Sequence, residues 1–136
     1  MSDGIPDALN ITAVETVDFD SDGDLDVLVV NLNDTPRLLR NDGGNRKHWL
    51  TVAIKLPGGK SDAVGARVAV KTGALTQVRD VIPVTGYLSQ ADPRAHFGLG
   101  EATKADVVEI RWPDGSTTKR TEVAADQVLT IVQGSP

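Results

Sequence analysis

Five aspartates at alternate positions from Asp18 to Asp26 constrain this chain more than any other feature. They form the run Asp-Phe-Asp-Ser-Asp-Gly-Asp-Leu-Asp, which contains one glycine, Gly23. Carboxylates this close repel one another and resist joint ionisation. A hard divalent cation would turn the repulsion into binding, because Ca2+ is held by several oxygen ligands, and glycine permits the positive φ that wraps a backbone around an ion. The spacing therefore predicts a calcium loop.

The flanking sequence distinguishes this loop from an EF-hand. An EF-hand requires a bidentate Glu at the twelfth loop position, between two helices, and this chain has Val29 there. An apolar strand pattern instead starts at Asp26 and continues to Asn31. The alternative that stays open is an acidic, solvated turn without an ion.

Composition indicates a soluble, domain-sized chain whose acidity is local. The 136 residues are enough for a hydrophobic core, and 40% of them are hydrophobic. The net charge of -5 comes from 14 Lys and Arg against 19 Asp and Glu, so the loop aspartates equal the whole acidic excess. The remaining charges balance, which argues against a basic nucleic-acid-binding surface.

Cysteine and hydropathy exclude further classes of protein. The chain has no cysteine, which excludes disulfides, thiolate zinc sites and cysteine nucleophiles. No apolar run approaches the ~20 residues of a membrane span, and residues 1–7 lack the basic and apolar segments of a signal peptide. We expect either an intracellular protein or a piece of a longer secreted one. The second suits the loop better, because loose extracellular loops bind Ca2+ at ~10^-4 to 10^-3 M.

Alternating apolar residues separated by Gly and Pro turns predict an all-β fold, a β-sandwich or a partly open barrel. The last predicted strand is apolar on both faces and is expected to be central, a bulge is expected near residues 80–82, and residues 123–127 are compatible with one helical turn. The glycine-rich residues 42–45 predict a boundary between domains at 1–43 and 44–136. The expected strands are about 8–17, 26–31, 37–41, 48–56, 64–70, 77–84, 107–112, 116–120 and 128–132.

The aspartate loop and the strand after it resemble an FG-GAP/VCBS repeat, the blade unit of integrin-like β-propellers. The shared pattern is D-x-D-x-D-G-x-L-D. A propeller needs several blades, so this single three-stranded meander is expected to pack on the rest of the chain, to belong to a longer protein, or to pair with another copy through its exposed edge. The resemblance implies that the Ca2+ ligands are the side chains of Asp18, Asp20, Asp22 and Asp26 and the backbone carbonyl of Asp24.

From about Gly44 to its end the chain resembles the ASPIC/UnbV domain, which follows such repeats in bacterial secreted or surface proteins. That resemblance implies an extracellular, cell-surface or periplasmic location. The family has no established chemistry, and a role in recognition or adhesion is implied by the repeats that it accompanies. The matching runs are residues 45–50, 64–68, 86–90, 92–100, 111–115 and 126–130.

A second candidate site lies between Gly86 and Gly100, where polar side chains gather. Trp112 adds an aromatic face of the kind that stacks on sugars. The plain interpretation is a structured loop, and the alternatives are a ligand-binding surface or, more weakly, hydrolysis, since the chain lacks a G-x-S-x-G nucleophile elbow. The candidate ligand-binding residues are Tyr87, Gln90, Asp92, Arg94, His96 and Trp112.

Taken together, the sequence predicts a non-catalytic, calcium-binding recognition or adhesion module whose partner is an unidentified protein or glycan. Two alternatives belong to other classes. One is a carbohydrate-binding accessory module, or an enzyme, that uses the loop from Tyr87 to His96. The other is a structural module that assembles through hairpin edges.

Overall fold

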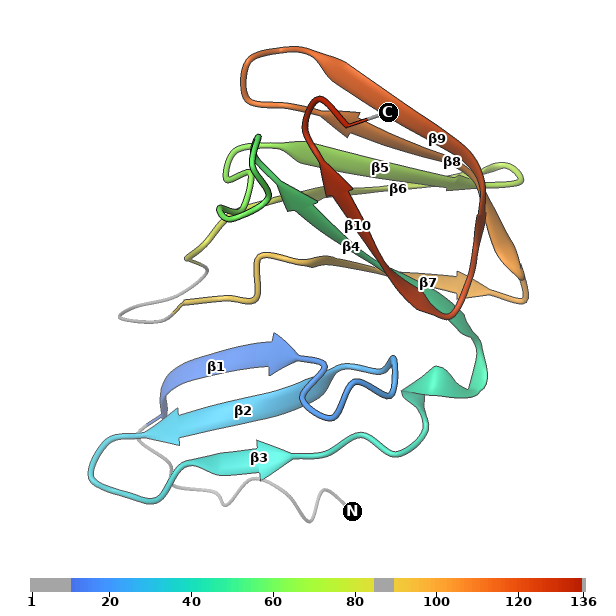
Figure 1. The fold of residues 1–136 in the computed structure, drawn as a ribbon. Helices are drawn as coiled ribbons and strands as arrows, with labels where there is room; N and C mark the ends of the chain where they lie inside the picture. Colours follow the sequence, from blue (N-terminus) through green and yellow to red (C-terminus); the bar gives the residue numbers. More distant parts are fainter. Residues whose placement is uncertain (1–10, 85–89, 136) are drawn as a thin grey trace.

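The computed structural model describes residues 11–84 and 90–135, and the regular structure of these residues is β-strand apart from one short 3₁₀ turn (Figure 1). The all-β prediction is confirmed. Within the described ranges the strands form three sheets. In chain order they are β1 (Ile11–Val17), β2 (Asp26–Asn31), β3 (Arg37–Leu39), a single 3₁₀ turn η1 (Gly44–Arg46), β4 (His48–Lys55), β5 (Arg67–Thr72), β6 (Leu75–Asp80), β7 (Ala95–Gly100), β8 (Lys104–Arg111), β9 (Thr117–Ala124) and β10 (Gln127–Val132).

The N-terminal sheet is an antiparallel meander in the order β1-β2-β3. Val17 pairs with Asp26, so the aspartate loop closes the hairpin between β1 and β2. Val29 on β2 is buried, which gives this small sheet an apolar centre. In the described part of the chain β1 and β3 each pair with β2 alone. Each is thus an edge strand, the kind of strand through which the sequence predicts pairing with another copy.

The rest of the chain forms a β-sandwich. One sheet has the order β10-β4-β7 and the other the order β6-β5-β8-β9. Their inner faces share one core, in which Leu50 and Phe97 from the first sheet meet Val68 and Ile110 from the second. The two sheets are separate hydrogen-bonded ladders over the described residues, so the structure favours the sandwich over the partly open barrel.

Strand β10 lies at an edge, and the prediction that it is central is wrong. Among the described strands it pairs, in parallel, with β4 alone, from Gln127 beside Leu50 to Val132 beside Lys55. Ile131 enters the core, but Val128 is 43% exposed. The central strand of this sheet is β4, where the five residues from Leu50 to Ile54 are all buried.

Two smaller predictions are also corrected. Residues 123–127 form no helical turn, because β9 continues to Ala124 and the chain turns at Asp126, which has φ 59, before β10 begins. The irregularity near residues 80–82 is a strand end rather than a bulge. Strand β6 stops at Asp80, and Val81 turns into the core, where its N–H donates to the Ala66 carbonyl (2.8 Å).

The meander lies beside the sandwich, with β1 as its nearest strand to β7 (Figure 1). The chain passes between them once, from β3 through η1 into β4. This passage contains residues 42–45, where the sequence predicts a domain boundary. None of the described segments is a helix long and apolar enough to cross a membrane.

Candidate metal centre and adjoining cleft

Three aspartates of the loop converge on one point. One carboxylate oxygen from each of Asp18, Asp20 and Asp22 lies within 4.8 Å of the others. Asp18 is only 6% exposed, and its Oδ1 is buried without a hydrogen-bond partner. An unpaired buried carboxylate oxygen is costly, and a cation would satisfy it. These oxygen donors fit a hard divalent ion such as calcium.

The electrostatics of the loop agree with that fit. The pKa of Asp20 is raised above its ordinary value, first by partial desolvation and then by repulsion from Asp22 and Asp26. Such crowding favours the protonated carboxyl in the ion-free loop. A bound divalent cation would favour the ionised form instead, because metal ligands must be deprotonated.

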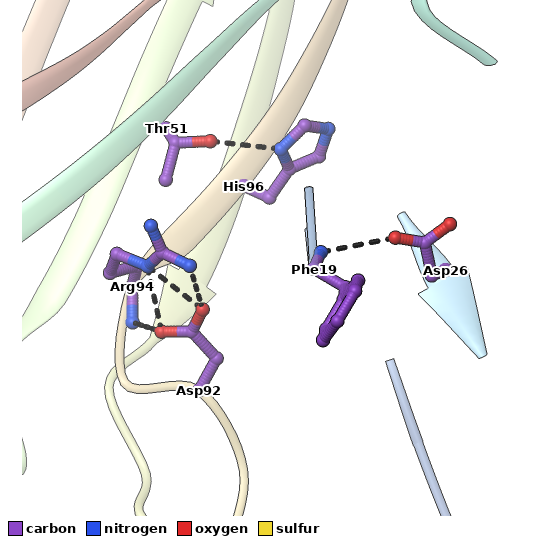
Figure 2. Close-up of polar contacts among 6 residues, drawn as sticks. All are labelled: Phe19, Asp26, Thr51, Asp92, Arg94 and His96. Carbon is purple, nitrogen blue, oxygen red and sulfur yellow. Dashed lines mark hydrogen bonds and ion pairs between the residues drawn. The ribbon is translucent and has the colours of Figure 1, made fainter. Parts of the chain in front are cut away.

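Asp24 and Asp26 lie outside this group of three. Their carboxylates accept hydrogen bonds from backbone N–H groups and so anchor the loop. Asp26 is fully buried, with Oδ2 accepting the Phe19 N–H (3.0 Å; Figure 2) and Oδ1 accepting the Asn41 N–H (2.8 Å). Asp24 Oδ2 accepts the Gly44 N–H (3.0 Å). The sequence predicts a side-chain ligand at Asp26, and in the structure each of its oxygens accepts one backbone N–H. A carboxylate oxygen has a second lone pair, so this role stays a prediction. The predicted role of the Asp24 carbonyl stays a prediction.

Several residues at this site were not predicted from the sequence. The Asn45 side chain donates to the Asp22 carbonyl (3.2 Å), and Gly23 lies against the indole of Trp49. The residues around Asn45 are typical of a linker, and the sequence favours a packing role for Trp49 over a sugar contact. Neither pattern indicates a contact with a loop more than twenty residues earlier in the chain.

A cleft of about 500 Å³ separates the meander from the sandwich. Three predicted ligand-binding residues line it, namely Asp92, Arg94 and His96, together with Thr51 and Arg79. The Arg94 guanidinium donates to Asp92 from Nε (2.8 Å) and Nη2 (2.5 Å), and His96 Nδ1 lies 3.0 Å from Thr51 Oγ1 (Figure 2). The cleft thus presents charged and hydrogen-bonding groups that are already oriented.

Burial and neighbouring charges shift two pKa values in the cleft. Burial acts to raise the pKa of Asp92, but hydrogen bonds from the Arg94 side chain and backbone outweigh it and hold the pKa below its usual range. Burial lowers the pKa of His96, and Arg79 and Arg94 add to the effect, while Asp18 and Asp24 partly offset it. Asp92 is therefore ionised and His96 neutral near pH 7.

Two of the other three predicted ligand-binding residues do not join them. Gln90 is exposed and is not among the residues that line the cleft. Trp112 is 2% exposed within the sandwich core, and its Nε1 donates to Thr118 Oγ1 (2.8 Å). Its ring face is thus covered, a position that argues against sugar stacking. Tyr87 lies outside the described residues.

The chain is similar in sequence to a known family and to several known proteins. The family described as ASPIC and UnbV matches residues 57–136, more than half of the chain. Cartilage acidic protein 1 from Mus musculus and from Homo sapiens are each 34% identical to it over 122 residues, which is 85% of this chain and 18% of theirs. The Xenopus tropicalis protein of that name is 32% identical over 127 residues, or 89% of this chain and 19% of its own. The chain spans about a fifth of the length of these relatives, and it belongs to the ASPIC/UnbV family.

Proposed function

We propose that this chain is a non-catalytic, calcium-binding module of an extracellular protein, and that it serves recognition or adhesion. Two observations at one place carry the proposal: carboxylate oxygens of Asp18, Asp20 and Asp22 converge, and Asp18 has a buried oxygen without a hydrogen-bond partner. In this proposal the N-terminal meander is an FG-GAP/VCBS-like blade. Membership of the ASPIC/UnbV family and the similarity to a protein named for cartilage support the extracellular setting.

The physical role of the ion would be to fix the hairpin loop. Without a cation the three carboxylates repel one another, and with it they become ligands of one centre. The stabilisation follows mass action, because the ion binds the folded loop and not the unfolded chain. At a free Ca2+ concentration ten times Kd it is about 1.4 kcal/mol.

The test is thermal melting in Ca2+, in Mg2+ and in EDTA. We expect Ca2+ to raise the Tm saturably in the unaltered chain. Asp20→Ala and Asp22→Ala should abolish this rise while leaving the Tm in EDTA within a few degrees. Asp34→Ala, which removes an exposed aspartate of the same meander, serves as the control and should keep the rise. An equal loss of Tm in Ca2+ and in EDTA would contradict the assignment of these residues as ligands.

The cleft favours a second candidate function, binding of a glycan. Small-molecule sites combine an apolar lining with a few placed polar groups, and here Asp92, Arg94, His96 and Thr51 supply carboxylate, guanidinium, imidazole and hydroxyl groups beside apolar Val14 and Ile82. A glycan array with the whole chain tests it. Binding should be lost in Arg94→Ala and retained in Arg111→Ala, an exposed arginine that does not line the cleft. An array without hits, or a hit that Arg94→Ala retains, would count against this function.

A further inference from the structure

We infer that the sandwich completes the aspartate loop, with Trp49 as a positioning residue that sets the loop's affinity for its ion. The inference rests on the proposed calcium function and deepens it, because it makes the ion site the joint property of two parts of the chain. The loop itself belongs to the meander, between β1 and β2, whereas Trp49 lies on β4, the central strand of a sandwich sheet.

The contact between Gly23 and Trp49 is the first line of argument. A Cβ at Gly23 would lie 2.0 Å from both Cε2 and Nε1 of the Trp49 indole, closer than any real contact. Gly23 also has φ 94, in the region that favours glycine. The loop backbone therefore lies directly on the indole ring, next to the candidate ligand Asp22.

Trp49 is itself held firmly in place. Its backbone N–H donates to Asp126 Oδ1 (3.2 Å), and its backbone carbonyl accepts the Asp126 N–H (2.7 Å). Its ring stacks on His96, with centroids 6.1 Å apart and planes 18° from parallel. The indole is thus a fixed surface, so that a loop conformation that fits it is favoured over others.

The segment around η1 supplies a second set of contacts to the same part of the loop. The Gly44 N–H donates to Asp24 Oδ2 (3.0 Å), and the Asn45 side chain donates to the Asp22 carbonyl (3.2 Å). Asp22, Gly23 and Asp24 are therefore each held by a residue that follows the meander. This part of the loop is ordered from outside before any ion arrives.

Pre-ordering a ligand lowers the entropy lost when the ion binds, so the docked loop should bind calcium more tightly than an undocked one. Coupling of this kind is reciprocal. If Trp49 strengthens ion binding by some factor, the ion strengthens docking of the meander on the sandwich by the same factor. The ion would then fix the orientation of the two parts as well as the hairpin.

Calorimetric titration of the whole chain with Ca2+ tests the inference. We expect Gly23→Ala to weaken binding by about tenfold, within the usual range of site-to-site coupling. Gly58→Ala is the matched control, because Gly58 has nearly the same φ (90) and no atom within 4 Å of an added Cβ. It should leave the affinity unchanged. Trp49→Ala, which removes the docking surface and leaves the loop sequence intact, should also weaken binding about tenfold.

The double variant Gly23→Ala with Trp49→Ala separates docking from backbone strain. If the methyl group acts by colliding with the indole, the two losses are not additive, and the double variant binds about as well as Trp49→Ala alone. Fully additive losses would overturn the contact as the cause. Melting in EDTA shows which variants are folded, and affinities are compared only among these. Trp49→Phe is a milder change that keeps an aromatic ring, in case Trp49→Ala does not fold.

The outcomes distinguish the inference from the function on which it rests. Calcium binding by the unaltered chain with no loss in Gly23→Ala, Trp49→Ala or Trp49→Phe would overturn the role of Trp49 and leave the calcium function standing. No binding by the unaltered chain would overturn the calcium function itself. Trp49 provides an independent readout, because its fluorescence in a Trp112→Phe background should change on calcium binding and stay constant with Mg2+ alone.

Discussion

Asp20 and Asp26 stand in one loop, yet their carboxylates do different work. Asp20 is exposed and lies among like charges, whereas Asp26 is fully buried and accepts two backbone N–H groups. We expect Asp26→Ala to lower the free energy of unfolding by about 2–4 kcal/mol in EDTA, because it removes a fully buried side chain that is the acceptor of two partly buried backbone N–H groups. Asp20→Ala should cost almost nothing under the same conditions. Urea denaturation in EDTA measures both, and equal costs would contradict this division of roles.

The candidate site was only partly predictable from the residues. Alternate aspartates around a glycine predict a cation loop from local spacing alone, and the structure brings Asp18, Asp20 and Asp22 together as expected. The hydrogen bonds that the Asp26 carboxylate accepts were not predictable, because one of the donors, Asn41, is 15 residues away and donates through its backbone. Every residue except proline has a backbone N–H, so the sequence does not indicate which of them donates to Asp26.

At the scale of elements, the period-two patterns predicted most strands, but they did not predict the order of strands in a sheet. The apolar residues of β10 suggested a central strand, yet β10 lies at an edge. Alternation reports which face of a strand is buried, whereas neighbours are chosen by contacts across the whole chain. The parallel pair of β10 with β4 joins residues more than seventy positions apart, and no local pattern indicates it.

The short segment from Asp42 to Arg46 illustrates the same limit. Its glycines and polar residues are typical of a flexible linker. In the structure Gly44 and Asn45 donate hydrogen bonds to the aspartate loop, and a Cβ at Gly44 would lie 2.8 Å from Asp24 Cβ. The glycine at position 44 is thus explained by close approach of two segments. Composition can suggest a linker, but only the three-dimensional fold shows what the linker contacts.

For the whole molecule, the most informative global property is the pH dependence of stability. His96 lies between the meander and the sandwich, with Asp18 and Asp24 from the aspartate loop and Arg79 and Arg94 from the sandwich as its charged neighbours. Burial lowers its pKa in the folded state, whereas in the unfolded chain it titrates near about 6.5. As the pH falls below that value, the unfolded chain binds a proton that the folded chain resists. Stability is then complete above pH ~6.5 and declines below it.

We therefore expect the free energy of unfolding to fall as the pH is lowered from 8 to 5.5, and His96→Asn to flatten this decline. At pH 8 the variant should be less stable than the unaltered chain, because it loses the contact with Thr51 and the stacking on Trp49. The difference should shrink toward pH 5.5. Urea denaturation across this range in EDTA measures the effect without an ion at the neighbouring loop. His48→Asn replaces the other histidine of the chain and serves as the control. It should keep the decline of the free energy of unfolding that His96 causes. Parallel curves for the unaltered chain and His96→Asn would show that this imidazole is as easily protonated in the fold as outside it.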